Sequence, residues 1–226
     1  MQGLTVVFDL DGTLIDTAPD LIGATNHVLG LAGMAAVPGD AIRPYVSFGA
    51  RAMIERGVAL NRQARPVADI DRMFETFLAY YAANIAAESR PYPALLATLD
   101  GLASAGARLA VCTNKREDLS RRLLAELAMT GRFAAICGRD TFAVCKPHPD
   151  HLTGAIRAAG GDTRRAVMVG DSNTDVATAK AAGIPVIGVS FGYTEVPMRD
   201  LAPDVVIDHY DEFAAALAGV VARRLG

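Results

Sequence analysis

The fold of this chain is decided near its N-terminus, by the stretch Thr5-Val6-Val7-Phe8-Asp9-Leu10-Asp11-Gly12-Thr13-Leu14. Its first four residues are mainly apolar and β-branched, which is typical of a strand that is buried on both faces of a parallel sheet. Asp9 and Asp11 follow at the end of that strand. Side chains at positions i and i+2 of an extended backbone point to the same side. Two carboxylates so close repel each other unless a cation or a proton lies between them, so the stretch predicts a strand that ends in a divalent-cation site.

Gly12 fits the same interpretation, because a glycine lets the backbone approach an anion closely. The alternative is an Asp-rich turn in which Gly12 only supplies the bend. This stretch alone does not separate the two explanations.

Further apolar runs of the same kind occur along the chain. They lie at 109–112, 134–137, 166–169, 185–189 and 205–207. Amphipathic segments such as 116–129, 150–159 and 174–182 separate them and are typical of crossover helices. The pattern predicts an α/β fold with a doubly wound parallel sheet and a Rossmann-like core. In such a fold, ligands bind at the carboxyl ends of the strands.

The interval between the first two runs lacks a strand pattern. It favours helices at 18–31, 39–46, 50–59 and 67–87. Pro38, Pro44 and Pro66 punctuate these segments, as prolines do at helix boundaries. We therefore predict an α/β core domain formed by 1–15 and 89–226, and an inserted all-helical cap domain at 16–88.

Composition excludes several classes of protein. The chain has 226 residues, 51% hydrophobic and 21% charged, with a net charge of −3. This balance is typical of a globular protein and does not favour binding to nucleic acid or to an anionic membrane. It contains no apolar run of membrane-spanning length and no secretory signal. Cys112, Cys137 and Cys145 show no metal or redox spacing, so we expect reduced thiols and a cytoplasmic location.

Three more groups of polar residues follow predicted strands. Thr113-Asn114 follows the run 109–112, although a helix cap explains this pair equally well. Lys146 precedes a predicted helix, where a lone lysine is usually solvated surface. Asp171 and Asp175 follow the run 166–169 with helical i, i+4 spacing, which also suits an acidic first turn.

Together these groups favour chemistry over structure. All of them follow strands of one predicted sheet, and the structural alternatives do not explain that coincidence. A few carboxylates beside a substrate phosphate form the environment that Mg²⁺ prefers. The sequence therefore predicts a phosphoryl-transfer site that uses Mg²⁺.

These residues resemble the four motifs of the haloacid dehalogenase superfamily, over essentially the whole chain. The matching segments are Asp9-Leu10-Asp11-Gly12-Thr13, Thr113-Asn114, Lys146-Pro147 and Gly170-Asp171-Ser172-Asn173-Thr174-Asp175. The helical insert resembles the small helical cap of that superfamily. Within it, the chain looks closest to the bacterial phosphoglycolate phosphatases. That likeness rests on the segments 111–115, 146–150, 179–183 and 189–193.

The resemblance implies a role for each residue. Asp9 would be the nucleophile that forms an aspartyl-phosphate, and Asp11 would serve as general acid and then as general base. The phosphoryl group would be bound by Thr113, the backbone N–H of Asn114, Lys146 and the backbone at Gly12. Mg²⁺ would be held by the side chains of Asp9 and Asp171 and by the carbonyl of Asp11. Asp175 would lie behind these ligands, acting through water or directed towards Lys146.

The expected substrate is a small phosphorylated metabolite, 2-phosphoglycolate, which is hydrolysed to glycolate and phosphate. Its carboxylate suits an arginine. The loop 46–51 resembles the substrate-specificity loop of the cap, so Gly49 and Arg51 are the candidates. Arg43 and Arg56 are rivals, and Arg51 also fits an ordinary arginine on a helix surface.

Several alternatives remain at this point. The same chemistry serves other sugar-phosphate phosphatases, mutases that resemble β-phosphoglucomutase, and pyrophosphatases. A receiver domain that accepts a phosphoryl group also uses a strand-end aspartate, a threonine, a lysine and Mg²⁺, but it is usually shorter and lacks a cap. The sequence allows either a monomer or a homodimer.

Overall fold

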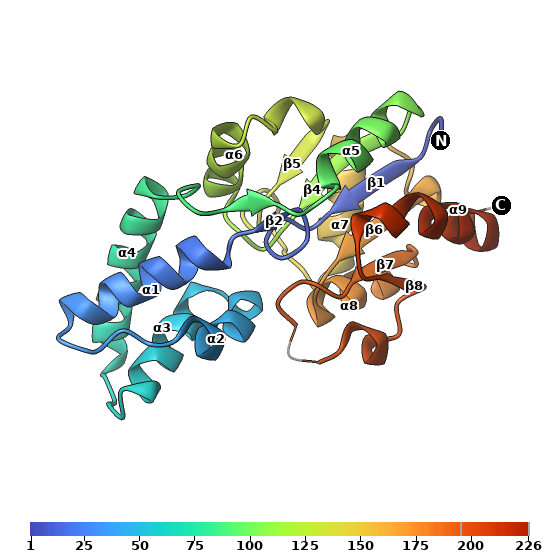
Figure 1. Ribbon diagram of the computed structural model, residues 1–226. Coiled ribbons are helices and arrows are strands. Elements are labelled where there is room, and N and C mark those ends of the chain that lie inside the picture. The colour runs from blue at the N-terminus through green and yellow to red at the C-terminus, as the bar shows by residue number, and fades with distance from the viewer. Residues whose placement is uncertain (195, 226) are drawn as a thin grey trace. The chain divides into compact units, whose positions relative to one another are not determined.

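The computed structural model describes every residue except 195 and 226. It divides into two compact units, one formed by Met1–Ile15 with Pro91–Gly226 and the other by Asp16–Arg90 (Figure 1). The chain passes between them within β2 (Ile15–Asp16) and β3 (Arg90–Pro91), which pair as a two-stranded sheet.

The larger unit contains a six-stranded sheet in the order β5-β4-β1-β6-β7-β8. All of its strand pairs are parallel. The strands are β1 (Thr5–Phe8), β4 (Arg108–Cys112), β5 (Ala135–Cys137), β6 (Ala166–Gly170), β7 (Val186–Val189) and β8 (Val205–Ile207). Each of the predicted apolar runs overlaps one of these strands, and the predicted doubly wound parallel sheet is confirmed.

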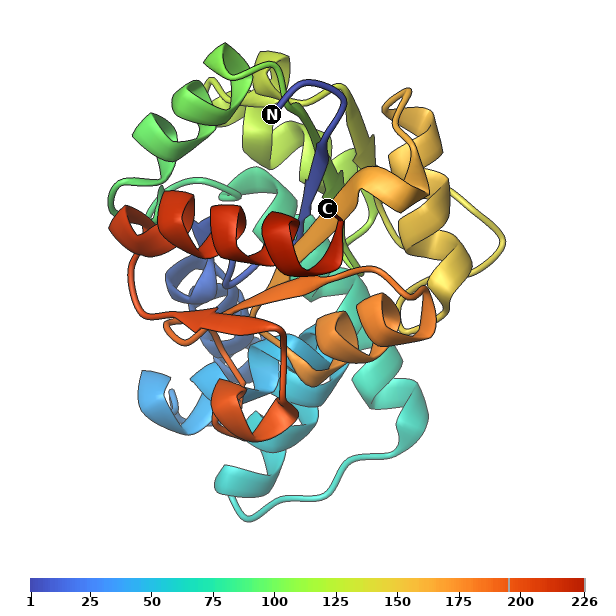
Figure 2. The ribbon, with the colours of Figure 1, turned by 90° about the vertical axis from the view of Figure 1, so that its right-hand side faces the viewer.

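Helices cover both faces of this sheet. They are α5 (Leu95–Ser104), α6 (Glu117–Glu126), α7 (Pro149–Ala158), α8 (Asn173–Ala181) and α9 (Phe213–Arg224). Figure 2 shows α5 and α9 on one face, with α7 and α8 on the other. Successive side chains of a strand point to opposite faces. Val7 accordingly joins the core under α7 and α8, whereas the ring of Phe8 stacks 6.0 Å from that of Phe213.

The central position of β1 in the sheet determines where the motif that follows it, residues 9–13, lies. Both edges of β1 are paired, with Thr5 in register with Arg108 of β4 and with Ala166 of β6. The loops that follow these three strands therefore start at the same edge of the sheet. The order of strands reverses direction at β1, and that switch point is where doubly wound sheets bind ligands.

The smaller unit is mainly helical. Its elements are α1 (Ala18–Leu31), α2 (Gly39–Ile42), the 3₁₀ helix η1 (Arg43–Phe48), α3 (Ala50–Leu60) and α4 (Val67–Ala83). The helix α1 packs against α3 and α4. Gly57 permits close approach to α1, because a Cβ there would lie 2.7 Å from Leu29. The buried carboxylate of Asp20 accepts hydrogen bonds from the backbone N–H groups of Glu88 and Ser89.

Two helix predictions in this unit are wrong. The single helix expected at 39–46 is split after Ile42, because Pro44 has no N–H to continue the α-helical hydrogen bonds. The helix expected at 67–87 ends at Ala83. There the side chain of Asn84 donates to the carbonyl of Tyr80 at 2.9 Å and competes with the next helical turn.

Among the described residues, no helix combines the length and the apolar character that a membrane crossing requires.

Candidate active site

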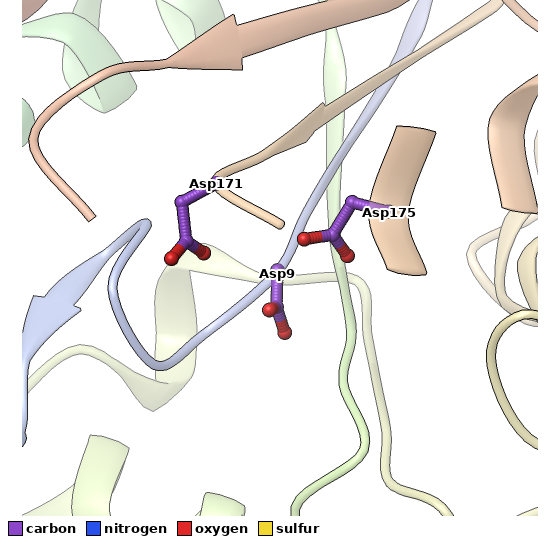
Figure 3. Close-up of side chains that lie close together, drawn as sticks. All are labelled: Asp9, Asp171 and Asp175. Carbon is purple, nitrogen blue, oxygen red and sulfur yellow. The ribbon is translucent and has the colours of Figure 1, made fainter. Parts of the chain in front are cut away.

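Four polar segments meet at the carboxyl edge of the sheet. Asp9 follows β1, Thr113 follows β4, Asp171 follows β6, and Lys146 lies in the segment before α7. Figure 3 shows the carboxylates of Asp9, Asp171 and Asp175 gathered there. Residues far apart in sequence are thus brought together by the topology of one sheet.

The three carboxylates form a buried acidic cluster. One oxygen of each of Asp9, Asp171 and Asp175 lies within 4.8 Å of the others. Burial raises the pKa of Asp9 to about 6, against the attraction of Lys146. Burial, followed by repulsion from Asp175 and Asp9, raises the pKa of Asp171 well above its ordinary value. The cluster is therefore short of positive charge around Asp171.

Lys146 supplies positive charge to the other side of the cluster. Its Nζ lies 3.0 Å from Oδ1 of Asp9 and donates a hydrogen bond of 2.6 Å to Oδ1 of Asp175. Burial by itself would lower the pKa of this ammonium, but Asp175 and Asp9 outweigh burial and the pKa is raised. Lys146 is therefore a permanently charged, fixed group beside Asp9.

Asp175 is engaged through both of its oxygens. Oδ1 accepts from Lys146, while Oδ2 accepts from the backbone N–H of Ser172 at 3.1 Å and from its hydroxyl at 2.6 Å. The hydroxyl of Ser172 in turn accepts from the N–H of Asp175, which completes a capping box at the start of α8. The sequence left two possibilities for Asp175, a role through water or a contact with Lys146, and the contact with Lys146 is present.

The donor set fits a divalent cation. Mg²⁺ prefers carboxylate oxygens together with water and phosphate, and Asp9 and Asp171 offer buried oxygens with raised pKa values. Each oxygen of Asp171 accepts one hydrogen bond, from the hydroxyl of Thr13 and from the N–H of Tyr193, both at 2.8 Å. A carboxylate has about four acceptor sites, so capacity for a cation remains.

Close backbone packing surrounds Asp171. Gly12 has φ +81°, and a Cβ on it would lie 2.4 Å from Oδ2 of Asp171. A Cβ on Gly192 would lie 2.2 Å from the same oxygen. Larger residues would displace this carboxylate. The sequence analysis missed the roles of Gly192 and Tyr193, although both belong to the quoted segment 189–193.

Asp11 lies outside this cluster and pairs with a lysine that the sequence analysis also missed. Nζ of Lys115 donates to both oxygens of Asp11, at 3.1 and 3.2 Å. Lys115 directly follows the Thr113-Asn114 pair. Its position next to this pair could have marked Lys115 as a candidate site residue. Nothing in the sequence, however, indicated that it contacts Asp11.

Thr113 and Asn114 lie close to the lysines. The side chain of Asn114 donates to the carbonyl of Lys146 at 2.9 Å. The hydroxyl of the buried Thr113 accepts from the N–H of Lys115 at 3.2 Å. Both residues therefore stabilise the loops that carry Lys115 and Lys146.

The substrate residues expected in the insert belong to the helical unit. Gly49 precedes α3 with φ +90°. The guanidinium of Arg51 pairs with Asp71, lies 3.8 Å from Glu55 and stands over the ring of Phe74. Of the rivals, Arg43 pairs with Asp16 at 3.1 Å and Arg56 lies over the ring of Tyr45. The roles of Gly49 and Arg51 stay predictions.

Proteins that are similar to this chain support the same assignment. A family model described as haloacid dehalogenase-like hydrolase matches residues 6–189. The chain belongs to that family. A protein from Mesorhizobium japonicum, named phosphoglycolate phosphatase, is 50% identical over 98% of this chain and 97% of its own length. A protein of the same name from Agrobacterium fabrum is 51% identical over 93% of this chain and 91% of its own.

A solved structure also resembles this haloacid dehalogenase-like hydrolase. The crystal structure of a predicted phosphoglycolate phosphatase from Haemophilus somnus matches with a TM-score of 0.88 and 26% identity, over 96% of this chain and 99% of that one. The chain is accordingly an enzyme, a phosphatase of the phosphoric monoester hydrolase class that acts on small phosphorylated substrates. Membership in this family also decides against the receiver-domain alternative.

Proposed function

We propose that this phosphatase hydrolyses 2-phosphoglycolate to glycolate and phosphate, with Mg²⁺, through a phosphoryl group carried on Asp9. One observation carries the mechanism: the buried carboxylate of Asp9 lies 3.0 Å from the ammonium of Lys146 and within 4.8 Å of a carboxylate oxygen of Asp171. The choice of substrate is supported by the relatives that bear the name phosphoglycolate phosphatase.

In the first step, a carboxylate oxygen of Asp9 forms a bond to phosphorus while the bond from phosphorus to the glycolate oxygen breaks. Oδ1 of Asp9 accepts a 2.7 Å hydrogen bond from the N–H of Leu10 and contacts Lys146, so the carboxylate is oriented before the substrate arrives. Such preorganisation is a main source of catalysis in phosphoryl transfer.

Asp11 moves the proton in both steps. It donates to the departing glycolate oxygen, which leaves Asp11 ionised. In the second step it accepts a proton from water as the water oxygen bonds to phosphorus and the bond to Asp9 breaks. One carboxyl group thus alternates as acid and base, and the nucleophile is regenerated.

The remaining polar groups bind the phosphoryl oxygens. Lys146, Thr113, the N–H of Asn114 and the backbone at Gly12 form this set in the proposal, and Lys146 brings a full positive charge. The side chains of Asp9 and Asp171 and the carbonyl of Asp11 would hold Mg²⁺, with Asp175 behind them. When bound, the cation neutralises charge on the acidic residues and on the phosphoryl oxygens.

The helical unit, Asp16–Arg90, acts as a cap domain in this proposal. Its Gly49 and Arg51 are the proposed substrate residues, with Arg51 as the partner of the glycolate carboxylate. The present partners of Arg51 are exposed. Exposed ion pairs contribute about 0–1 kcal/mol to stability. Replacing Asp71 and Glu55 by a substrate carboxylate as the partner of Arg51 therefore costs little free energy.

A substrate panel tests the proposal. Phosphate release is measured from 2-phosphoglycolate, hexose phosphates, pyrophosphate and p-nitrophenyl phosphate, each with Mg²⁺ and after EDTA. We expect 2-phosphoglycolate among the best substrates and EDTA to abolish turnover. A preference for hexose phosphates or pyrophosphate would overturn the choice of substrate, and activity that resists EDTA would overturn the role of the cation.

A trapping experiment tests the covalent step separately. The Asp11→Asn variant is mixed with substrate, quenched in acid and examined by mass spectrometry. We expect a phosphoryl group on the peptide that contains Asp9, and none in the double variant that also carries Asp9→Asn.

A further inference from the structure

Lys115 and Asp11 form a shielded ion pair between loops that are distant in sequence. Nζ of Lys115 donates to both oxygens of Asp11, 104 residues away. The side chain of Lys115 is 6% exposed and that of Asp11 is 20% exposed. A pair so shielded from solvent is geometrically constrained, unlike the exposed ion pairs that contribute little.

The backbone of Lys115 is fixed on both sides. Its N–H donates to the hydroxyl of Thr113 at 3.2 Å, and its carbonyl accepts from the N–H of Arg139 at 2.9 Å. The ammonium therefore projects from an anchored loop. The pair therefore ties the carboxylate of Asp11 to this anchored loop.

The composition of the chain makes this lysine unusual. The sequence contains 22 basic residues, and 3 of them are lysines, Lys115, Lys146 and Lys180. Two of these lysines lie in the candidate site. Lysine offers a compact charge on a flexible stem, whereas arginine favours planar, two-point contacts. The compact ammonium of Lys146 contacts two carboxylates, and that of Lys115 contacts both oxygens of one.

The two site lysines contact different carboxylates. Lys146 contacts Asp9 and Asp175, which belong to the acidic cluster, and Lys115 contacts Asp11, which does not. Asp9 and Asp11 are two residues apart, so the carboxylate of Asp11 lies close in sequence to a ligand of a cation in the cluster, and Lys115 competes with such a cation for it. A carboxylate that binds the cation is lost for proton transfer.

We propose that Lys115 is a positioning residue that holds the carboxylate of Asp11 away from the acidic cluster and in place for proton transfer to the leaving group. This inference rests on the proposed role of Asp11 as general acid. It assigns to Lys115 a function that acts through Asp11 and not through contact with the substrate.

The test compares leaving groups. Lys115→Met is assayed with 2-phosphoglycolate, whose alkoxide leaving group needs a proton, and with p-nitrophenyl phosphate, whose leaving group departs as a stable anion. We expect kcat to fall about a hundredfold on the first substrate and by at most a few-fold on the second, because general acid catalysis contributes about 10²–10⁴-fold. KM changes little, and Lys115→Arg restores part of the loss.

Two controls accompany the variant. Lys180→Met removes a lysine whose Nζ donates to the carbonyl of Leu201, outside the site, and both substrates should keep their wild-type kcat. Thermal unfolding monitors stability, and Lys115→Gln, which keeps a polar side chain, replaces Lys115→Met if the latter does not fold.

A double-mutant cycle with Asp11→Asn decides whether Lys115 acts through Asp11. If it does, Lys115→Met adds almost no loss to the Asp11→Asn variant. Equal losses on both substrates, or full additivity in the cycle, would overturn the inference. If the wild type prefers another alkyl phosphate over 2-phosphoglycolate, the proposed substrate fails, and the leaving-group test is run on that preferred ester.

Discussion

Nδ1 of the His151 imidazole accepts a hydrogen bond from the backbone N–H of Lys146 at 3.1 Å. The other ring nitrogen, Nε2, lies 3.0 Å from the carbonyl of Gly138 and donates to it. Burial, together with the charge of Lys146, lowers the pKa of His151 to about 4. A neutral histidine on α7 therefore fixes the backbone of the residue that contacts Asp9.

His151→Phe should lower both stability and turnover. The buried N–H of Lys146 loses its acceptor, which costs about 1–3 kcal/mol. Lys146 is then less well placed beside Asp9, so kcat should fall while KM changes little. Urea denaturation and steady-state kinetics measure the two effects. His209→Ala, at an exposed helix cap, serves as control and should leave kcat unchanged; an unchanged kcat in His151→Phe would contradict the prediction.

The same histidine should make stability depend on pH. Its pKa in the folded protein is depressed from 6.5 to about 4, so between these values the unfolded chain binds more protons than the folded one. Stability contributed by neutral His151 is full above pH 6.5 and is lost as the pH falls towards 4. Denaturation at several pH values should show a steeper decline for the wild type than for His151→Phe. Parallel profiles would show that folding does not lower the pKa of His151.

Asp9→Asn should abolish turnover without unfolding the protein. The amide is a poor nucleophile, and the loss should exceed about a thousandfold, as for other covalent catalysts. The fold should persist because the amide nearly matches the carboxylate in size and removes one of the crowded negative charges of the cluster. Activity assays and circular dichroism check both parts, and substantial residual turnover would rule out the covalent route.

Gly192→Ala should weaken magnesium binding. The added Cβ would meet the carboxylate of Asp171 at 2.2 Å and push it out of place. Isothermal titration calorimetry should show at least about tenfold weaker binding, in line with changes near metal ligands. Gly101→Ala in α5, where a Cβ meets nothing within 4 Å, is the matched control. Equal affinities of the two variants for Mg²⁺ would exclude Asp171 as a ligand.

Much of the sheet was predictable because buried parallel strands leave a local pattern. Val6 and Val7 are fully buried, and the run around them predicts a strand without knowledge of any partner. The positions of Asp9, Thr113, Lys146 and Asp171 at the carboxyl edge then follow from the topology of doubly wound sheets.

Other features depend on contacts that leave no local pattern. The pair of Lys115 with Asp11 and the hydrogen bond from Tyr193 to Asp171 join residues that are far apart in the sequence. His151 lies beside two prolines and two polar residues, which do not indicate burial. The break at Pro44 was foreseeable from the missing N–H, but the residues around it have ordinary helical spacing.

The place of β1 in the middle of the sheet has a consequence for synthesis on the ribosome. β1 is synthesised before both of its neighbours, which begin at Arg108 and Ala166. The helical unit, Asp16–Arg90, is continuous and is complete before either neighbour is made. Until the strand that begins at Ala166 is made, the nascent chain therefore carries an apolar strand with at least one unpaired edge. Such a segment is of the kind that chaperones bind and that aggregates when they are scarce.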